Sequence, residues 1–344
     1  MNAALRMSTL IALAATQALP SPAAYAAESA TSVYLLGSKG AMAGFTPPPG
    51  TYIIDANYYY SGSAGGTAAQ GIVLPKTRAE ITATINVEGQ AYYNIPTVVW
   101  VAPSPVLGGN FGFSLMTPIG YKGVEADMTA QATVTLPPPI GTLSAGRSLR
   151  LEDDRTAFGD PLASAFIGWH SGNWHYNITA MANIPLGQWD TSQLANIGFN
   201  HWAFDFTGAV TWLDPKVGFE LSAALGITFN TENPDTNYKS GTDFHVEFAA
   251  LQHLSKQFSI GLAGYHYQQL TGDSGTGAVL GDFKGRVTGI GPAMTYNFQV
   301  GQVPVMTSVK WTHEFNTENR LKGDMGLLTV AIPLGPPPPA PSMK

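Results

Sequence analysis

The sequence predicts an all-β fold, a transmembrane antiparallel up-and-down β-barrel of about 12 strands. Three observations support this prediction. Apolar and polar residues alternate strictly in several long segments, short and long connections alternate between these segments, and charged residues make up only 12% of the 344 residues. Soluble domains usually contain about 25% charged residues. This chain therefore has few charged side chains with which to cover a surface that faces water.

The alternation is clearest in residues 216–230. Every second residue there is apolar, and the residues between are mostly small or polar; the apolar ones are Val217, Phe219, Leu221, Ala223, Leu225, Ile227 and Phe229. Successive side chains of a strand point to opposite faces, so this pattern is typical of a strand with two unlike sides. Residues 78–90, 124–136, 174–184 and 202–212 follow the same rule. A soluble exported β-sandwich would alternate too, and it is the alternative fold.

The connections between the predicted strands favour the barrel. Alternation and turn residues predict strands at 51–60, 78–103, 110–136, 160–170, 173–186, 201–213, 216–231, 240–253, 256–271, 283–299, 303–316 and 322–334. Their connections are alternately short and long, and the longer ones are 61–77, 137–159, 187–200, 232–239, 272–282 and 317–321. A barrel with periplasmic turns and extracellular loops has this arrangement, whereas a Greek-key sandwich does not require it. The even number places both ends of the barrel on the periplasmic side. In 256–271 and 283–299 the sequence does not assign inward and outward faces.

The N-terminal residues 1–26 are expected to form a secretory signal peptide. They contain Arg6, a short apolar run and the small-x-small triplet Ala24-Tyr25-Ala26 before the expected cleavage site. A short amphipathic helix is the alternative. No later apolar run reaches the roughly 18 residues that a spanning helix needs, so insertion has to be by strands. We predict a barrel at 51–334, a proline-rich tail at 335–344, and a location in the bacterial cell outer membrane.

The segment 27–50 precedes the first strand and is unusually apolar for a periplasmic tail, which should be polar. We expect it to fold into or across the barrel as a plug. The plug candidates are the large apolar side chains Leu35, Leu36, Met42 and Phe45. The alternative is that the segment packs beneath the barrel or binds another protein.

The polar faces of the strands should line the lumen, the space that the barrel encloses. The candidates for a constriction at mid-depth are Glu88, Glu220, Glu247 and Lys310, and those nearer the outer rim are Arg78, Glu80, Asp205, Arg286 and Glu314. The lumen should therefore be acidic with isolated basic groups. Mutual salt bridges inside a filled barrel are the alternative. About 12 strands make a barrel wider than one of about 8 that side chains fill and narrower than open porins, so a narrow gated pore fits.

Two short motifs have plain structural explanations. "WHSGNWH" brings His170, Ser171 and Asn173 together, as in an outer-membrane phospholipase, but these residues fall in a predicted tight turn and a catalytic serine needs a base positioned in space. "FNTEN" occurs at 229–233 and 315–319, where turn chemistry is expected. The alternative is a carboxylate rim of Glu232 and Glu318 that binds divalent cations or lipid head groups. The seven histidines show no metal-ligand spacing. We predict no catalytic residue, no metal site and no cofactor.

Several segments resemble a known family. "TPPPGTYIIDANYYYSG", "DPKVGFELSAALGITFNTENPDTNY", "SGTDFHVEFAALQHLSKQFSIGLAGYHYQQLTGDSG" and "LGDFKGRVTGIGP" are similar to the meta-pathway of phenol degradation family, from about residue 31 to residue 334. The resemblance implies an outer-membrane barrel associated with the catabolism of aromatic compounds, and it brings no catalytic residues. The chain departs from the usual outer-membrane pattern at its last strand, which ends on Leu334 where an aromatic residue is common.

The sequence and this resemblance together predict a channel or transporter for small hydrophobic or aromatic compounds, and no enzyme. The expected partners are outer-membrane lipid, those solutes and the barrel assembly machinery. Nucleic acid is not expected, because the net charge is −6 and lysine and arginine form no cluster. An outer-membrane enzyme of the lipase kind and a structural barrel or adhesin are the alternatives.

Overall fold

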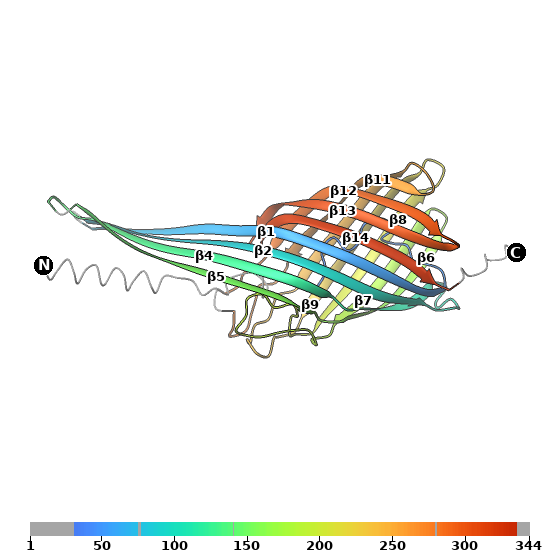
Figure 1. Cartoon of the computed structure of the whole chain (residues 1–344), viewed down its shortest axis with the longest axis horizontal. Helices are drawn as coiled ribbons and strands as arrows, with labels where there is room; N and C mark the ends of the chain where they lie inside the picture. The colour runs from blue at the N-terminus through green and yellow to red at the C-terminus, as the bar shows by residue number, and fades with distance from the viewer. Residues whose placement is uncertain (1–30, 75–76, 140, 279–280, 336–344) are drawn as a thin grey trace.

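The computed structural model describes residues 31–74, 77–139, 141–278 and 281–335, which form one antiparallel sheet of fourteen strands (Figure 1). The strands are β1 (Gly50–Leu74), β2 (Thr77–Val101), β3 (Asn110–Met116), β4 (Ile119–Thr135), β5 (Thr142–Phe158), β6 (Leu162–Ser171), β7 (Trp174–Asn183), β8 (Ala203–Asp214), β9 (Phe219–Asn230), β10 (Asp243–His253), β11 (Phe258–Gln269), β12 (Arg286–Val300), β13 (Val303–Glu318) and β14 (Lys322–Leu334). Among the described residues, no helix is long and apolar enough to cross a membrane.

The sheet closes into a barrel because β1 pairs with β14 on one side and with β2 on the other. Two of the ring positions hold an interrupted strand. The strands β3 and β4 both pair with β2 and are separated only by Thr117 and Pro118, while β5 and β6 are separated by residues 159–161. Counting each interrupted strand once turns fourteen strands into a ring of twelve. The predicted closed barrel of twelve strands is confirmed.

Both ends of the barrel wall lie at the same end of the molecule, because Thr51 at the start of β1 pairs with Leu334 at the end of β14. The connections at this end are short, for example the turn between β6 and β7, in which Ser171 pairs with Trp174. The longest connections, 184–202, 231–242 and 270–285, lie at the opposite end. The connection lengths predict this parity. We call the end with the short turns the periplasmic end, as expected for an outer-membrane barrel.

Four strands continue far beyond the barrel wall (Figure 1). β1 pairs with β14 only as far as Ser63, but its pairing with β2 continues to Leu74, and β4 and β5 extend beside them. We refer to residues 64–74, 77–88, 124–135 and 142–153 as the extension. The expectation of extracellular loops at 61–77 and 137–159 is therefore wrong. Neighbouring strands satisfy the backbone hydrogen bonds there, so the Gly-, Ser- and Ala-rich residues 61–74 form a strand although their alternation is weak.

In the extension, polar residues face outward and apolar residues face inward, which is the opposite of the arrangement in the barrel. Within the barrel the outward residues are apolar, as at Leu221 on β9, and the inward residues are polar, as at Glu220. In the extension Glu88 is exposed and has the same parity as the outward Tyr92, whereas Val87 is buried on the face that continues the lumenal side. The outward face meets water once the strands have left the lipid, so polar residues occupy it there.

The outward face of the barrel also carries a polar cluster between β1 and β2. The Asp55 carboxylate accepts hydrogen bonds from Asn57 at 2.8 Å and from Asn94 at 2.7 Å, and the Tyr92 hydroxyl donates to the Asn57 side-chain oxygen at 2.7 Å. A polar group that faces lipid is costly unless it is hydrogen-bonded. These mutual bonds lower that cost.

Candidate functional site

Residues 31–49 lie inside the barrel, where backbone amides of the segment bond to side chains of the wall. The Gly37 amide donates to Glu247 Oε1 on β10 at 3.2 Å, and the Met42 amide donates to Glu220 Oε1 on β9 at 2.6 Å. The Gly44 amide donates to Thr211 Oγ1 on β8 at 2.9 Å. Glu220 and Glu247 are 0% and 1% exposed, so these amides supply hydrogen bonds to carboxylate oxygens that water does not reach.

The first part of the segment packs against a buried aromatic and acidic group. The Tyr34 ring stacks on the His245 imidazole with the ring centroids 3.5 Å apart and the planes at 18°. His245 Nε2 lies 2.8 Å from Asp205 Oδ2, and Thr228 donates its hydroxyl to the same oxygen at 2.7 Å. The Lys310 ammonium group on β13 donates to the backbone carbonyl of Lys39. Contacts from β10 and β13 therefore hold residues 34–39, and Asp205 on β8 positions the His245 side chain.

The last part of the segment closes against the periplasmic ends of β6 and β7. Asn177 donates to Thr46 Oγ1 at 2.8 Å, and His170 Nε2 lies 3.1 Å from the Thr46 carbonyl oxygen. The Phe45 ring lies 5.0 Å from the His170 ring and 5.4 Å from the His175 ring, centroid to centroid. The segment thus runs down the lumen and joins β1 at the periplasmic mouth.

Gly44 is where the segment comes closest to the wall. A Cβ atom at this position would lie 2.4 Å from the His175 carbonyl oxygen and 2.6 Å from the Thr211 amide nitrogen. Both are backbone atoms of the wall, which cannot move aside without disturbing the sheet. The glycine is therefore required by a close approach of two backbones.

A tyrosine-rich cluster joins the segment to the opposite wall. Its buried members are Tyr34, Leu36, Tyr265, Tyr267, Val287, Met325 and Leu327, and the half-buried Ala56, Tyr58, Tyr60 and Met181 pack against them. Glu314 accepts hydrogen bonds from the Tyr60 hydroxyl at 2.7 Å, from the Tyr265 hydroxyl at 2.8 Å and from the Gly323 amide at 2.9 Å. The Arg320 guanidinium lies 4.2 Å above the Tyr267 ring centroid, a cation–π arrangement.

The structure brings together only part of the predicted lumenal set. Glu220, Glu247 and Lys310 surround residues 37–42, and Asp205 and Glu314 also face the lumen. Whether they form a constriction stays a prediction.

The expectation that Glu88 and Glu80 line the lumen is wrong, because both are exposed on the outward face of strand β2. Arg78 belongs to the part of β2 near the tip of the extension, well beyond the barrel rim. Arg286 forms an ion pair of 2.9 Å with Glu318, and both side chains are about half exposed. Glu318, the acidic residue of the second "FNTEN" motif, is thus held in an ion pair.

The plug candidates differ in their surroundings. Leu36 is buried in the tyrosine-rich cluster, Leu35 and Met42 are half-buried, and Phe45 is exposed at the periplasmic end. Of these four candidates, Met42 bonds to the wall through its backbone amide. The other residues of the segment that bond to the wall are Gly37, Lys39, Gly44 and Thr46, mostly through their backbone. Sequence patterns do not identify such residues, because every residue type except proline has the same backbone amide and carbonyl groups.

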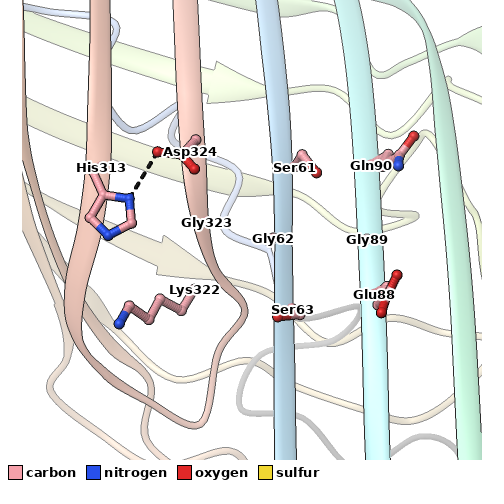
Figure 2. A pocket seen from close by; sticks show the side chains of 10 residues that line it. All are labelled: Ser61, Gly62, Ser63, Glu88, Gly89, Gln90, His313, Lys322, Gly323 and Asp324. Atoms are coloured by element: carbon pink, nitrogen blue, oxygen red, sulfur yellow. Dashed lines mark hydrogen bonds and ion pairs between the residues drawn. The ribbon is translucent and has the colours of Figure 1, made fainter.

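A separate groove of about 420 Å³ lies at the extracellular rim (Figure 2). Its lining residues are Ser61, Gly62, Ser63, Glu88, Gly89, Gln90, His313, Lys322, Gly323 and Asp324. His313 Nδ1 and Asp324 Oδ1 lie 2.9 Å apart. Gly323 pairs with Gly62, and Gly62 with Gly89, so three glycines in register form part of the groove. Among the residues that the structure describes, no group of three or more potential ligands is arranged to hold a metal ion.

The comparisons with known proteins agree with this architecture. A protein-family model described as "Putative MetA-pathway of phenol degradation" matches residues 54–330. Among solved structures, the chain is similar to a COG4313 outer membrane channel from Pseudomonas putida F1, with a TM-score of 0.59 and 13% identity over 84% of this chain and 97% of that chain. At this identity, the likeness shows the fold alone.

Weaker likenesses are to the CymD monoaromatic hydrocarbon channel and to a FadL homologue from Pseudomonas aeruginosa. For CymD the TM-score is 0.40 and the identity 5%, over 84% of this chain and 89% of that chain. For the FadL homologue the values are 0.34 and 10%, over 84% and 93%. Neither score is high enough to carry an argument. A comparison with curated proteins finds no match.

Proposed function

Because the chain belongs to the family described as "Putative MetA-pathway of phenol degradation", we propose that it is an outer-membrane channel for small hydrophobic, mainly aromatic, compounds, with residues 31–49 as a plug. The closed twelve-stranded ring supports a channel, since a barrel of this width has room that its own side chains do not fill. The COG4313 outer membrane channel has the same fold. The description of the family supports aromatic solutes.

The observation that carries this proposal is the way in which the wall holds the segment. Glu220, Glu247 and Lys310 bond to its backbone from β9, β10 and β13. Polar groups on this side of the lumen are thus occupied by the chain itself. A segment fixed in this way narrows the route for ions and hydrophilic solutes.

The lumenal residues of β1 and β2 have a different character, which Met181 on β7 shares. Ile54, Ala56 and Tyr58 on β1, Tyr93 on β2 and Met181 on β7 are all half-buried. These side chains are apolar or aromatic, and they are more accessible than the charged residues that hold the segment. Apolar walls favour solutes that leave water readily, so we assign the solute route to this side.

The geometry of "WHSGNWH" does not support the lipase-like alternative. His170 Nδ1 lies 2.7 Å from His175 Nδ1, and His170 Nε2 lies 3.1 Å from the Thr46 carbonyl oxygen. Both ring nitrogens are therefore engaged with groups other than Ser171, which sits in the tight turn beside Trp174. A serine nucleophile needs a hydrogen bond to its base, so this arrangement supports a structural role for His170 at the end of the segment.

Deleting residues 28–45 tests the plug, with residues 1–27 and "TPPPG" retained. The truncated chain should still give a folded, heat-modifiable barrel, and its single-channel conductance in planar bilayers should rise above that of the full chain. An unchanged conductance would contradict the plug.

Solute passage is measured separately. Cells that express the full chain should accumulate a radiolabelled aromatic compound faster than cells with an empty vector, at equal amounts of folded barrel in the outer membrane. Equal rates would contradict the channel function.

A further inference from the structure

Tyr58 on β1 and Tyr93 on β2 form a pair on the lumenal side of the wall. The two residues are directly opposite each other in the β1–β2 register. Both side chains are half-buried, and their ring centroids lie 6.3 Å apart with the planes at 34°. Two aromatic faces are thus presented side by side to the lumen on the apolar route.

Small residues flank this pair. Ala56 precedes Tyr58 and Ala91 precedes Tyr93 on the inward faces of their strands. Across the ladder from Tyr93 lies Gly120 on β4, where a Cβ atom would be 2.2 Å from Tyr93 Cδ1. The Tyr93 ring therefore lies over the backbone of β4, and only a glycine permits this.

Residues of the segment and of the facing wall border the pair on its lumenal side. Tyr58 and Met181 both pack against the cluster that contains Tyr34 and Leu36. These side chains are apolar or aromatic where they meet. A solute packed against the lumenal side of Tyr58 and Tyr93 would touch these rings of the wall and apolar groups of the plug.

The hydroxyl groups of this pair differ from those of the neighbouring lumenal tyrosines. The Tyr60 and Tyr265 hydroxyls donate to Glu314, and the Tyr267 hydroxyl donates to Asp243 at 2.6 Å. Within the described part of the chain, neither Tyr58 nor Tyr93 makes a side-chain hydrogen bond. Their hydroxyls are therefore available to a polar group of a solute.

We propose that Tyr58 and Tyr93 form a binding site for a monocyclic aromatic solute that carries one hydrogen-bonding group, such as a phenol. The solute ring packs against the two tyrosine rings, which favour offset or edge-to-face contacts, and its polar group bonds to a tyrosine hydroxyl. This proposal rests on the proposed channel function, and it places a solute-binding site on the route that the solute takes through the barrel. An aliphatic alcohol loses the ring contacts, and an unsubstituted benzene ring loses the hydrogen bond.

The site is tested by fluorine NMR with 3-fluorophenol and fluorobenzene as probes. Each probe is titrated into the full chain, purified from the outer membrane and reconstituted in nanodiscs, and the saturable component of binding is measured against empty nanodiscs. Replacing both hydroxyls, with Tyr58→Phe and Tyr93→Phe together, should weaken 3-fluorophenol binding by about three- to tenfold, the usual range for one lost hydrogen bond. Fluorobenzene binding should not change. Tyr93→Leu should weaken the binding of both probes.

The matched control is Tyr59→Phe, which removes a hydroxyl from the neighbouring residue of β1 on the outward face. This variant should bind both probes as the unchanged chain does. Equal 3-fluorophenol affinity in the double variant and the unchanged chain would overturn the site, and so would an equal loss in Tyr59→Phe. If those results came with normal uptake of aromatic compounds by cells, the site would fail and the channel function would stand. If the unchanged chain failed to support uptake, the channel function itself would fail.

Discussion

The backbone amide of Met42 donates a hydrogen bond of 2.6 Å to Glu220, a fully buried carboxylate on the lumenal face of β9. The same carboxylate accepts the Ser222 hydroxyl at 2.7 Å and lies 2.8 Å from His253 Nε2. A buried carboxylate is costly unless hydrogen bonds satisfy it. The Met42 amide is thus one of the hydrogen-bond donors that stabilise the buried Glu220 carboxylate. The same bond fixes the segment to the wall.

Removing the two acceptors should loosen the segment. In the double variant Glu220→Ala and Glu247→Ala, the Met42 and Gly37 amides lose partners whose hydrogen bonds contribute roughly 1.5–3 kcal/mol each. We expect a higher mean single-channel conductance in planar bilayers, with a barrel that remains heat-modifiable. The control is Glu232→Ala, because Glu232 is exposed in the connection after β9. A double variant with the conductance of this control would mean that these carboxylates do not hold the segment.

Adding one methyl group at Gly44 should also displace the segment. In Gly44→Ala, the new Cβ atom would lie 2.4 Å from the His175 carbonyl oxygen, and overpacking of this kind costs about 1–3 kcal/mol. We expect raised conductance together with a lower thermal unfolding temperature. Gly66→Ala serves as the control, since a Cβ atom there meets nothing within 4 Å. If both variants behaved like the unchanged chain, the close approach at Gly44 would not exist in the membrane.

An arginine on the lipid-facing surface should impair insertion. Leu225 on β9 is 54% exposed at an outward position, and a midplane arginine facing lipid costs roughly 2–4 kcal/mol. Leu225→Arg should lower the amount of heat-modifiable barrel in outer-membrane fractions. Leu270→Arg is the matched control, because Leu270 is similarly exposed, at 45%, but follows the end of β11. Equal yields of the two variants would argue against lipid contact at Leu225.

Labelling of single cysteines in intact cells should report the topology. Thr276→Cys in the connection after β11 and Ser144→Cys near the tip of the β4–β5 hairpin should both react with a membrane-impermeant maleimide, because both positions are exposed beyond the barrel wall. Pro215→Cys, in the short turn after β8, should react only after the outer membrane is opened. The opposite pattern would invert the barrel. Protection of Ser144→Cys alone would contradict an extension that projects from the cell surface.

The sequence by itself determined the barrel. Alternation such as that of residues 216–230 defines a two-faced strand whatever surrounds it, and the alternating connection lengths set the direction of each strand. The same alternation placed Glu220, Glu247 and Lys310 on the faces that turn inward. These features are local, so they can be read from short stretches of chain.

Only the tertiary structure decided which face of a strand meets which surroundings. Alternation put Glu88 on a polar face, but that face turns outward, as at Tyr92 on the same strand. Polar residues can occupy it there because β2 has left the lipid by this point and water lies outside the wall. Residues 61–74 form a strand because β2 supplies hydrogen-bonding partners for their backbone. Their own sequence does not predict a strand. The contacts of Gly37 and Met42 with the wall use backbone amides across more than 170 positions of the chain. Because every residue type except proline carries the same backbone N–H group, only the closure of the barrel around the segment selects which amides bond to Glu247 and Glu220.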